Sequence, residues 1–294
     1  IVTIMFISFF CLQLIAFRII SSALGIVLLF ALEFYRKKFV AHKSMRLLMD
    51  CHAFWTLFIC ICVLVDHSMA AFSRYTAKIP TDILLTTAQC LPRRLLGAIA
   101  LYGSVTSMLA MAMERRSASQ NCATYEQTGR SSGYLYSLFH LVIALTFGGI
   151  LWATYGYNSR TPHCTIVTPQ GLIELNIINV VLFIMEISTI VIFAALLRRN
   201  QMSLQQAKFK ISLTERALLS KICRHQLTEN IRMLKLFLPV VGTHTSLTLA
   251  GLIAFFGFQL SGLGVDYYPM FEDSINFIYL QGIFMPIIFL FRYR

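Results

Sequence analysis

Residues 172–197 read LIELNIINVVLFIMEISTIVIFAALL, an almost unbroken apolar run with Glu186 near its middle. An α-helix rises about 1.5 Å per residue, so a run of this length crosses the roughly 30 Å hydrocarbon core of a bilayer. Hydrophobic residues make up 57% of the 294 residues and charged residues only 13%, more apolar surface than one soluble core can bury. The stretch therefore predicts a membrane-spanning helix.

Apolar blocks of similar length recur along the chain and predict an all-α membrane protein, one domain with seven transmembrane helices. Their approximate limits are 10–32, 45–66, 95–113, 134–154, 172–197, 236–260 and 273–291. Arg18 interrupts the first block, so it lies either near the rim or facing the bundle. A cleaved signal peptide would need a basic start and a small-residue cleavage site, and residues 1–17 have neither.

The basic residues predict the orientation, because positively charged loops stay on the cytoplasmic side during insertion. Of the 25 Lys and Arg residues, five lie in the first connection, which includes Arg46 at the start of the second block; three lie between the third and fourth blocks, nine from 198 to 235, and two at the end. These 19 fall on one side, which predicts an outer N-terminus and a cytoplasmic C-terminus. Basic residues that flank membrane segments interact with lipid headgroups, so nucleic-acid binding is not expected.

Two cysteines, Cys90 and Cys164, are the only ones in predicted outer loops; the other six lie in predicted helices or in segments on the inner side. Cys90 precedes the third helix and Cys164 lies between the fourth and fifth. A disulfide between them would hold that loop over the mouth of the bundle. Two free thiols are the alternative.

Motifs of catalysis are missing from the sequence: there is no HExxH, no nucleotide-binding glycine loop and no CxxC pair with metal spacing. His140 and His244 stand alone in predicted helices, where hydrogen bonds between helices are a more usual role than metal ligation. We therefore expect neither an enzyme nor a bound cofactor. A transporter or channel remains the alternative, although the two halves show no internal repeat.

A charged pair, Glu114 and Arg115, ends the third apolar block directly after Met113. At a wet boundary such a pair is worth about 1 kcal/mol. One interpretation is that Arg115 reaches toward lipid headgroups. The other is a signalling switch, in which Glu114 holds Arg115 in an inactive state and releases it toward a cleft beneath the fifth and sixth helices.

The residues around this pair resemble a known signature. Glu114, Arg115, Ala118, Ser119, Tyr125 and Glu126 follow the pattern ER..A[ST].....YE of nematode serpentine chemoreceptors of the Sre family, within the Sra superfamily. A second resemblance to that family comprises Leu219, Ser220, Gln226, Leu227, Thr228, Glu229, Asn230 and Ile231, and a weaker third one comprises His42 and Lys43. His225, Arg116 and Ser117 depart from the family pattern.

This resemblance implies a G-protein-coupled receptor that detects a small environmental chemical in the plasma or ciliary membrane of a sensory neuron. Its implied partners are a small-molecule ligand, the lipid bilayer and a heterotrimeric G protein at the cytoplasmic face.

Pro239 and Pro286 interrupt helical hydrogen bonding, as static kinks or as hinges. The basic segment 198–235 either extends two helices into the cytoplasm or lies against the inner leaflet.

Ligand pockets of this kind form between helices near the outer side and carry few polar groups. Candidate ligand contacts at suitable depth are Tyr102, Phe255, Gln259, Asn276 and Tyr279, each of which could equally be ordinary packing. Glu186 is costly in lipid and is expected to face the interior. It is either a ligand counter-charge or a hydrogen-bond partner between helices.

Overall fold

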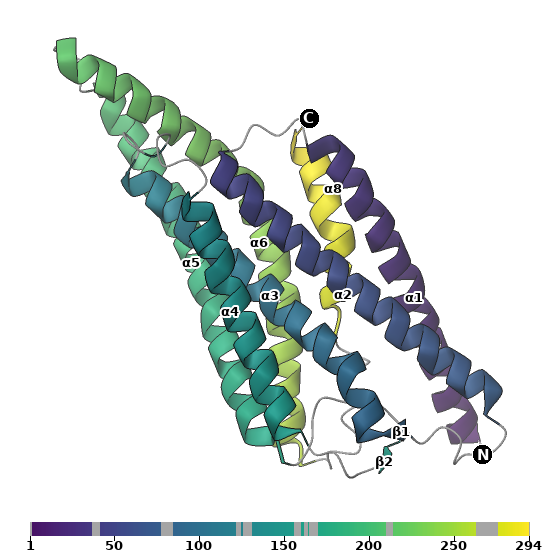
Figure 1. The fold of residues 1–294 in the computed structure, drawn as a ribbon. Coiled ribbons are helices and arrows are strands. Elements are labelled where there is room, and N and C mark those ends of the chain that lie inside the picture. Colours follow the sequence, from purple (N-terminus) through teal and green to yellow (C-terminus); the bar gives the residue numbers. More distant parts are fainter. Residues whose placement is uncertain are drawn as a thin grey trace.

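Each apolar block becomes a helix, and the helices run side by side as a long bundle in the computed structural model (Figure 1). The structure describes residues 2–36, 42–77, 85–121, 125, 131–155, 160–161, 164, 170–209, 214–262 and 276–293. Within these ranges the α-helices are α1 (Val2–Arg36), α2 (Lys43–Thr76), α3 (Thr87–Gln120), α4 (Ser131–Thr154), α5 (Leu172–Phe209), α6 (Thr214–Leu260) and α8 (Gln281–Tyr293). The 3-10 turn η4 (Ile278–Leu280) leads into α8, and β1 (Leu85–Thr86) pairs antiparallel with β2 (Arg160–Thr161).

The seven helices confirm the predicted fold class of an all-α membrane bundle. Six contain an apolar window long enough to cross a bilayer, and Ile278–Arg292 is a shorter apolar helix. Most helices extend beyond the predicted blocks because hydropathy marks the lipid-covered part of a helix and not its ends. At α3, for example, Thr86 caps the helix and forms a reciprocal capping box with Gln89, well before the apolar run begins. The predicted seventh block begins too early: residues 276–277 are not helical, and the helical part begins at η4 and continues into α8.

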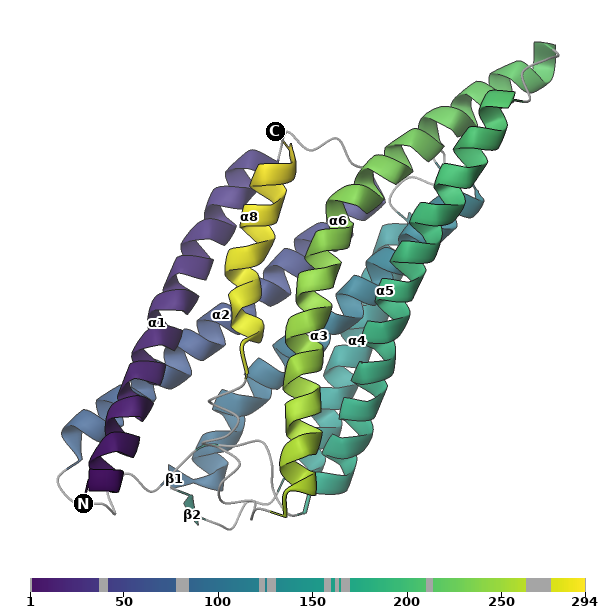
Figure 2. The same ribbon diagram turned by 180° about the vertical axis from the view of Figure 1, so that it is seen from behind.

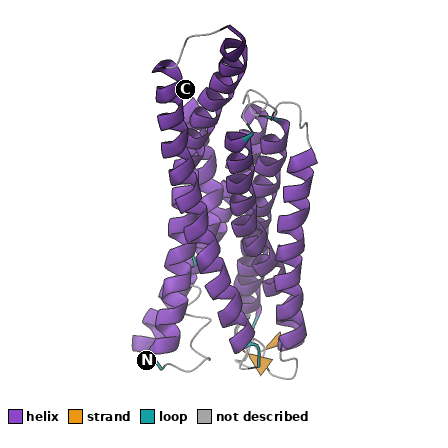
Figure 3. Cartoon of the chain, turned by 90° about the vertical axis from the view of Figure 1, so that its left-hand side faces the viewer, coloured by secondary structure: helices purple, strands orange, loops and turns teal. Residues whose placement is uncertain are grey.

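The two ends of the bundle differ in structure. One end carries the first turns of α1 and the β1–β2 pair (Figure 3). It is here called the disulfide end, because Cys90 and Cys164 form a disulfide there. The opposite end, here called the motif end, carries Glu114 and Arg115 at the last turns of α3. At the motif end α5 and α6 continue together well past the other helices (Figures 1 and 2).

Helix α3 lies at the centre of the bundle and packs against α2, α4, α5 and α6. Its apolar window is 67% buried, against 22% for that of α4, which lies at the periphery. The outer helices expose large apolar side chains such as Ile20, Val27, Leu135 and Ile173. Water would make this exposure costly, whereas hydrocarbon is a suitable surrounding for it.

Close helix contacts depend on glycine at a few positions. A Cβ atom added at Gly103 of α3 would lie 2.3 Å from an indole carbon of Trp55 on α2. Trp55 is fixed in turn, because its Nε1 donates to His140 Nε2 on α4 at 3.1 Å. By contrast, a Cβ atom at Gly149 would meet nothing within 4 Å. Small residues at such contacts let membrane helices approach closely.

We therefore predict that Gly103→Ala lowers the stability of the protein, by about 1–3 kcal/mol for an overpacked site. Gly149→Ala is the matched control, since both changes add one methyl group to a helical glycine. Thermal unfolding of the purified protein, together with surface expression, measures the difference. Equal melting temperatures for the two variants would contradict this account of the α2–α3 contact.

Candidate functional site

The first candidate site is the charged pair at the motif end of α3. Arg115 Nε donates to Glu114 Oε2 at 2.7 Å, and its Nη2 lies 2.6 Å from the same oxygen. Glu114 has no exposed surface and Arg115 is 4% exposed. The expectation of a wet boundary is therefore wrong, because neighbouring helices cover the pair. Breaking a buried pair by removing one partner costs about 3–5 kcal/mol, several times the value of an exposed pair.

Tyr125 completes this charged pair from the segment that follows α3. Its hydroxyl donates to Glu114 Oε1 and accepts from Arg115 Nη2 at 2.9 Å. Burial, the largest cause, raises the pKa of Tyr125 well above its ordinary value, so the hydroxyl keeps the proton that it donates. The ring of His42, the residue that caps α2, lies 4.3 Å from the Tyr125 ring between centroids.

Asn230 links the pair to α6. Arg115 Nη1 donates to Asn230 Oδ1 at 2.9 Å, and Asn230 Nδ2 donates to Ser119 Oγ at 2.7 Å. The same Ser119 oxygen accepts from Asn200 Nδ2 of α5 at 3.0 Å and donates to the Arg115 carbonyl at 2.9 Å. We call these five residues and Tyr125 the motif cluster: Glu114, Arg115, Ser119, Tyr125, Asn200 and Asn230. The cluster ties α3 to α5 and α6 by side-chain hydrogen bonds.

The second candidate site is a cavity of about 160 Å³ toward the disulfide end, between α1, α2, α3, α5, α6 and η4. Four of the six predicted ligand contacts line it: Tyr102, Phe255, Asn276 and Tyr279. Gln259 is placed elsewhere and donates to Asn176 Oδ1 on α5 at 2.8 Å. Pockets for drug-sized ligands are about 300–1,000 Å³, so this cavity suits a smaller molecule.

Glu186 is buried below the cavity, where it contacts α6 and does not belong to the cavity wall. Its Oε2 accepts from Thr245 Oγ1 at 2.7 Å, and its Oε1 lies 3.0 Å from His244 Nδ1. His244 Nε2 lies 2.9 Å from Ser104 Oγ on α3. Of the two roles left open for Glu186, this geometry is that of a partner between helices.

Arg18 faces the bundle and forms part of the cavity wall. It is 2% exposed, and its Nη2 donates to the Asn276 carbonyl at 3.2 Å. His67 Nδ1 lies 2.9 Å from the Val63 carbonyl, which fixes the donor there and leaves Nε2 to accept from Arg18 Nη1 at 3.3 Å. The guanidinium also lies 5.5 Å from the centre of the Tyr279 ring.

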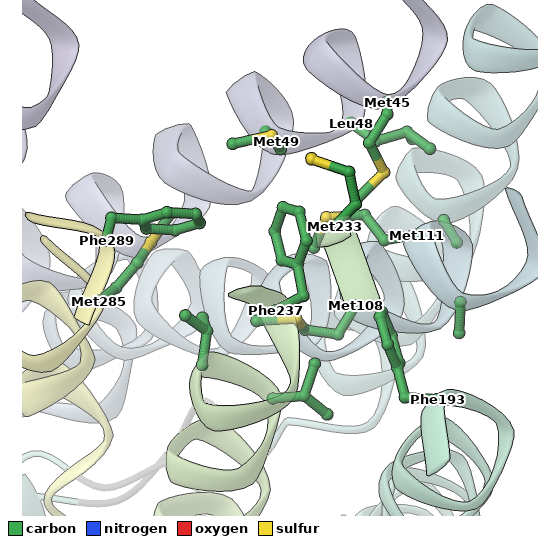
Figure 4. Close-up of a cluster of buried hydrophobic side chains, with 14 of the residues drawn as sticks. Met45, Leu48, Met49, Met108, Met111, Phe193, Met233, Phe237, Met285 and Phe289 are labelled. Carbon is green, nitrogen blue, oxygen red and sulfur yellow. The ribbon is translucent and has the colours of Figure 1, made fainter. Parts of the chain in front are cut away.

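An apolar layer lies along the helices between residues of the cavity wall and residues of the motif cluster. Its buried members include six methionines and three phenylalanines: Met45, Met49, Met108, Met111, Met233, Met285, Phe193, Phe237 and Phe289. Figure 4 shows them converging from several helices, with Phe237 of α6 near the centre. Methionine is unbranched and flexible, so such a layer tolerates small movements of its helices.

Comparison with known families resolves the identity of the bundle. The family model described as "Serpentine type 7TM GPCR receptor class ab chemoreceptor" matches residues 1–294. The chain belongs to this class ab family. Among curated proteins, "Serpentine receptor class alpha/beta-14" of Caenorhabditis elegans is 25% identical over 260 residues, which cover 84% of this chain and 64% of that protein. The chain thus spans less than two thirds of the length of that relative.

Membership in class ab confirms the serpentine chemoreceptor resemblance and an integral, multi-pass membrane protein. The family is one of receptors and not of enzymes, in agreement with the sequence analysis. The match is to class ab, and the Sre family suggested by the motifs is not confirmed.

The class ab chain brings its three motif segments together in space. His42, Glu114, Arg115, Tyr125 and Asn230 come from segments far apart in sequence and meet at the motif end. Ala118 is 5% exposed, Gln226 and Glu229 are half-buried, and Glu126 lies outside the described residues.

Sequence reasoning missed Asn200 and the part that Ser119 plays. Asn200 directly follows Arg198 and Arg199, a position that reads as the solvated end of a helix, yet it is 1% exposed. The sequence feature that could have indicated its burial is an uncharged amide directly after two arginines. Sequence reasoning also missed Asp66 and Arg94, whose side chains lie 3.5 Å apart in the cavity wall.

The structure joins Cys90 and Cys164 across 74 residues, which holds the segment after α4 to the start of α3. We predict that a membrane-impermeant maleimide labels the receptor at these positions only after reduction. A variant with both cysteines changed to Ser serves as the control and should show no gain of label upon reduction. Labelling of the unreduced receptor above that control would show that the two thiols are free.

Proposed function

We propose that this class ab chain is a chemosensory G-protein-coupled receptor. A small environmental chemical binds in the cavity at the disulfide end, and the motif end activates a heterotrimeric G protein. The observation that carries the proposal is the motif cluster, which joins α3 to α5 and α6 where those two helices extend past the bundle. A receptor needs a contact that differs between two states, and a buried charge network of this kind provides one.

The proposed switch is the pair Glu114 and Arg115. In the inactive state Glu114 and Tyr125 hold the guanidinium, while Asn230 ties it to α6. Separation of α6 from α3 would break the Asn230 contact and leave Arg115 facing the cleft between α3, α5 and α6. A partner helix of the G protein would then bind in that cleft.

The disulfide end faces outward in this proposal, and the motif end faces the cytoplasm of a sensory neuron, at its plasma or ciliary membrane. Support comes from the 19 Lys and Arg residues on the motif side, since such residues favour the cytoplasmic side. The long helical extensions of α5 and α6 hold eight of them between residues 198 and 235.

Epitope tags test this orientation. A tag at Asp266, between α6 and η4, should be labelled on intact cells, whereas a tag inserted between Phe209 and Thr214 should need permeabilisation. Surface labelling of the tag between α5 and α6 would reverse the orientation. Each tagged receptor is first checked for normal surface amount, which serves as the control for folding.

Substitutions in the pair test the switch. Glu114→Gln removes the charge but keeps an acceptor oxygen, so we expect basal signalling to rise about tenfold, equivalent to about 1.4 kcal/mol. Arg115→Ala should abolish coupling. Arg116→Ala is the matched control, because Arg116 is exposed at the neighbouring position. This variant should reduce signalling only if contacts with lipid headgroups are needed for it.

Second-messenger assays in heterologous cells measure these variants at matched surface expression. Asn230→Ala keeps the buried pair intact and removes its tie to α6, so it should raise basal signalling without loss of protein. If Arg115→Ala signals normally, or if Arg116→Ala is equally defective, the switch is wrong. A transporter, by contrast, would accumulate labelled compound in cells that lack G proteins.

A further inference from the structure

The middle of the bundle holds a carboxylate and an imidazole in direct contact, on the two helices that continue past the motif end. Glu186 of α5 is 1% exposed and His244 of α6 has no exposed surface. Glu186 Oε1 lies 3.0 Å from His244 Nδ1, and Thr245 Oγ1 of α6 donates to the other carboxylate oxygen at 2.7 Å. The contact lies within the apolar spans of α5 and α6, where lipid offers neither group another partner.

His244 also contacts α3, because its Nε2 lies 2.9 Å from Ser104 Oγ. Each nitrogen of the ring therefore has a partner, and the two partners belong to different helices. If α6 turns or moves away from α5 at this level, the contact between His244 and Glu186 breaks. Buried polar groups that lose a partner are costly unless a new partner is within reach.

His52 of α2 offers such a partner. Its ring is 1% exposed and lies edge-on to the ring of His244, with 5.5 Å between centroids. Ser107 Oγ donates to the Ser104 carbonyl at 2.8 Å, so it accepts the hydrogen of His52 Nδ1 at 3.0 Å. The other nitrogen of the neutral ring, Nε2, is then an acceptor, and it has no hydrogen-bond partner among the described residues. Such an acceptor favours an arrangement that brings it a donor.

We infer that His244 exchanges partners when α6 moves, from Glu186 of α5 to His52 of α2. In the present structure His244 holds α6 to α5. In the second position α6 has turned, and a ring nitrogen of His244 donates to His52 Nε2. This inference rests on the proposed receptor function, in which α6 moves, and it adds the contact that regulates the movement in the middle of the bundle.

One turn of α6 serves both His244 and the motif cluster. Asn230 and His244 lie about four helical turns apart, so they project from nearly the same side of α6. Both contact α3 in the present structure. A turn that takes His244 from Glu186 toward α2 therefore also moves Asn230 out of the motif cluster. Because a new partner replaces the lost one, the second position is discrete.

The distance between the ends of α3 and α6 tests this inference without any G protein. Spin labels are attached through non-natural residues at Gln120 of α3 and Thr228 of α6, which are both exposed at the motif end. The purified protein is measured in lipid nanodiscs. Two distance populations are expected, one for each position of α6, with the shorter distance in the majority. Basal signalling of the same variants is measured in cells.

Variants of the two alternative partners should act in opposite directions. Glu186→Gln removes the charge but keeps an acceptor, so it should raise the population with the longer distance about tenfold. Adding His52→Phe to this variant keeps a ring but removes the acceptor, and should return the populations toward those of the unchanged protein. A purely structural role for the two side chains predicts lower stability in each variant and no opposition between them.

Thr189→Val is the matched control on α5. Thr189 is 1% exposed, and its Oγ1 donates to the Met185 carbonyl of the same helix at 2.8 Å. The variant removes a buried hydroxyl but no hydrogen bond between helices, so both populations should stay unchanged. If Glu186→Gln fails to fold, Thr245→Val takes its place, because it removes another hydrogen bond between α5 and α6 and should act in the same direction.

The outcomes separate this inference from the receptor function. A shift caused by Glu186→Gln and reversed by His52→Phe, without any G-protein signal, supports the exchange of partners and contradicts the receptor proposal. Normal signalling with populations that neither variant changes overturns the exchange and leaves the receptor proposal standing. An equal shift in Thr189→Val, or a shift that His52→Phe does not reverse, also overturns the exchange.

Discussion

A polar group inside a lipid-covered bundle has to find its partner within the protein, because hydrocarbon offers none. Helix α3 shows how this constraint organises the fold. Along its length Ser104 meets His244 of α6, Ser107 meets His52 of α2, and Arg115 meets Asn230 of α6. Each contact fixes the rotation of a neighbouring helix about α3. Apolar packing alone would leave such rotations poorly defined, since lipid tails are as apolar as leucine. The central position of α3 therefore follows from its buried polar side chains.

The motif cluster extends this constraint to the end of the bundle and changes how the pair Glu114 and Arg115 has to be understood. At a wet boundary the pair would be weak, and either partner could be lost at little cost. Covered as it is, the guanidinium depends on every acceptor around it, and Tyr125, Glu114 and Asn230 supply them. Two of these acceptors are near in sequence and one belongs to α6. Movement of α6 away from α3 would therefore leave Arg115 with contacts on one side only. This change of contacts is the proposed switch.

The sequence predicted the bundle well because hydropathy reports directly on contact with lipid. It placed all seven helices but shortened most of them, since capped and basic turns such as Thr87–Arg94 are helical without being apolar. The seventh block was the exception, because its first residues are not helical. Partners were harder to predict. Whether Arg18 lay near the rim or faced the bundle could not be decided, because helix placement depends on contacts between residues far apart, such as Arg18 with Asn276. Asn200 was missed for the same reason, because its burial comes from Ser119 of another helix. The motif resemblance located Glu114, Arg115 and Asn230, but it did not indicate that Asn230 contacts Arg115.

Helix α6 physically connects the cavity with the motif cluster. Thr248 lines the cavity, His244 and Thr245 contact Ser104 and Glu186 near the middle, and Asn230 holds Arg115 at the motif end. Pro239 lies between His244 and Asn230 on this helix. Proline has no backbone N–H, so one hydrogen bond that would stiffen the helix there is missing. The apolar layer around Phe237 surrounds the same stretch of α6, and its methionine side chains can repack at little cost in free energy. The polar contacts of α6 are either made or broken, whereas the apolar packing between them adjusts easily. This combination favours two discrete positions of α6 over a continuous range. In the proposed function, a ligand in the cavity would bias the choice between these positions by changing the place of Thr248 relative to Tyr102, since both line the cavity.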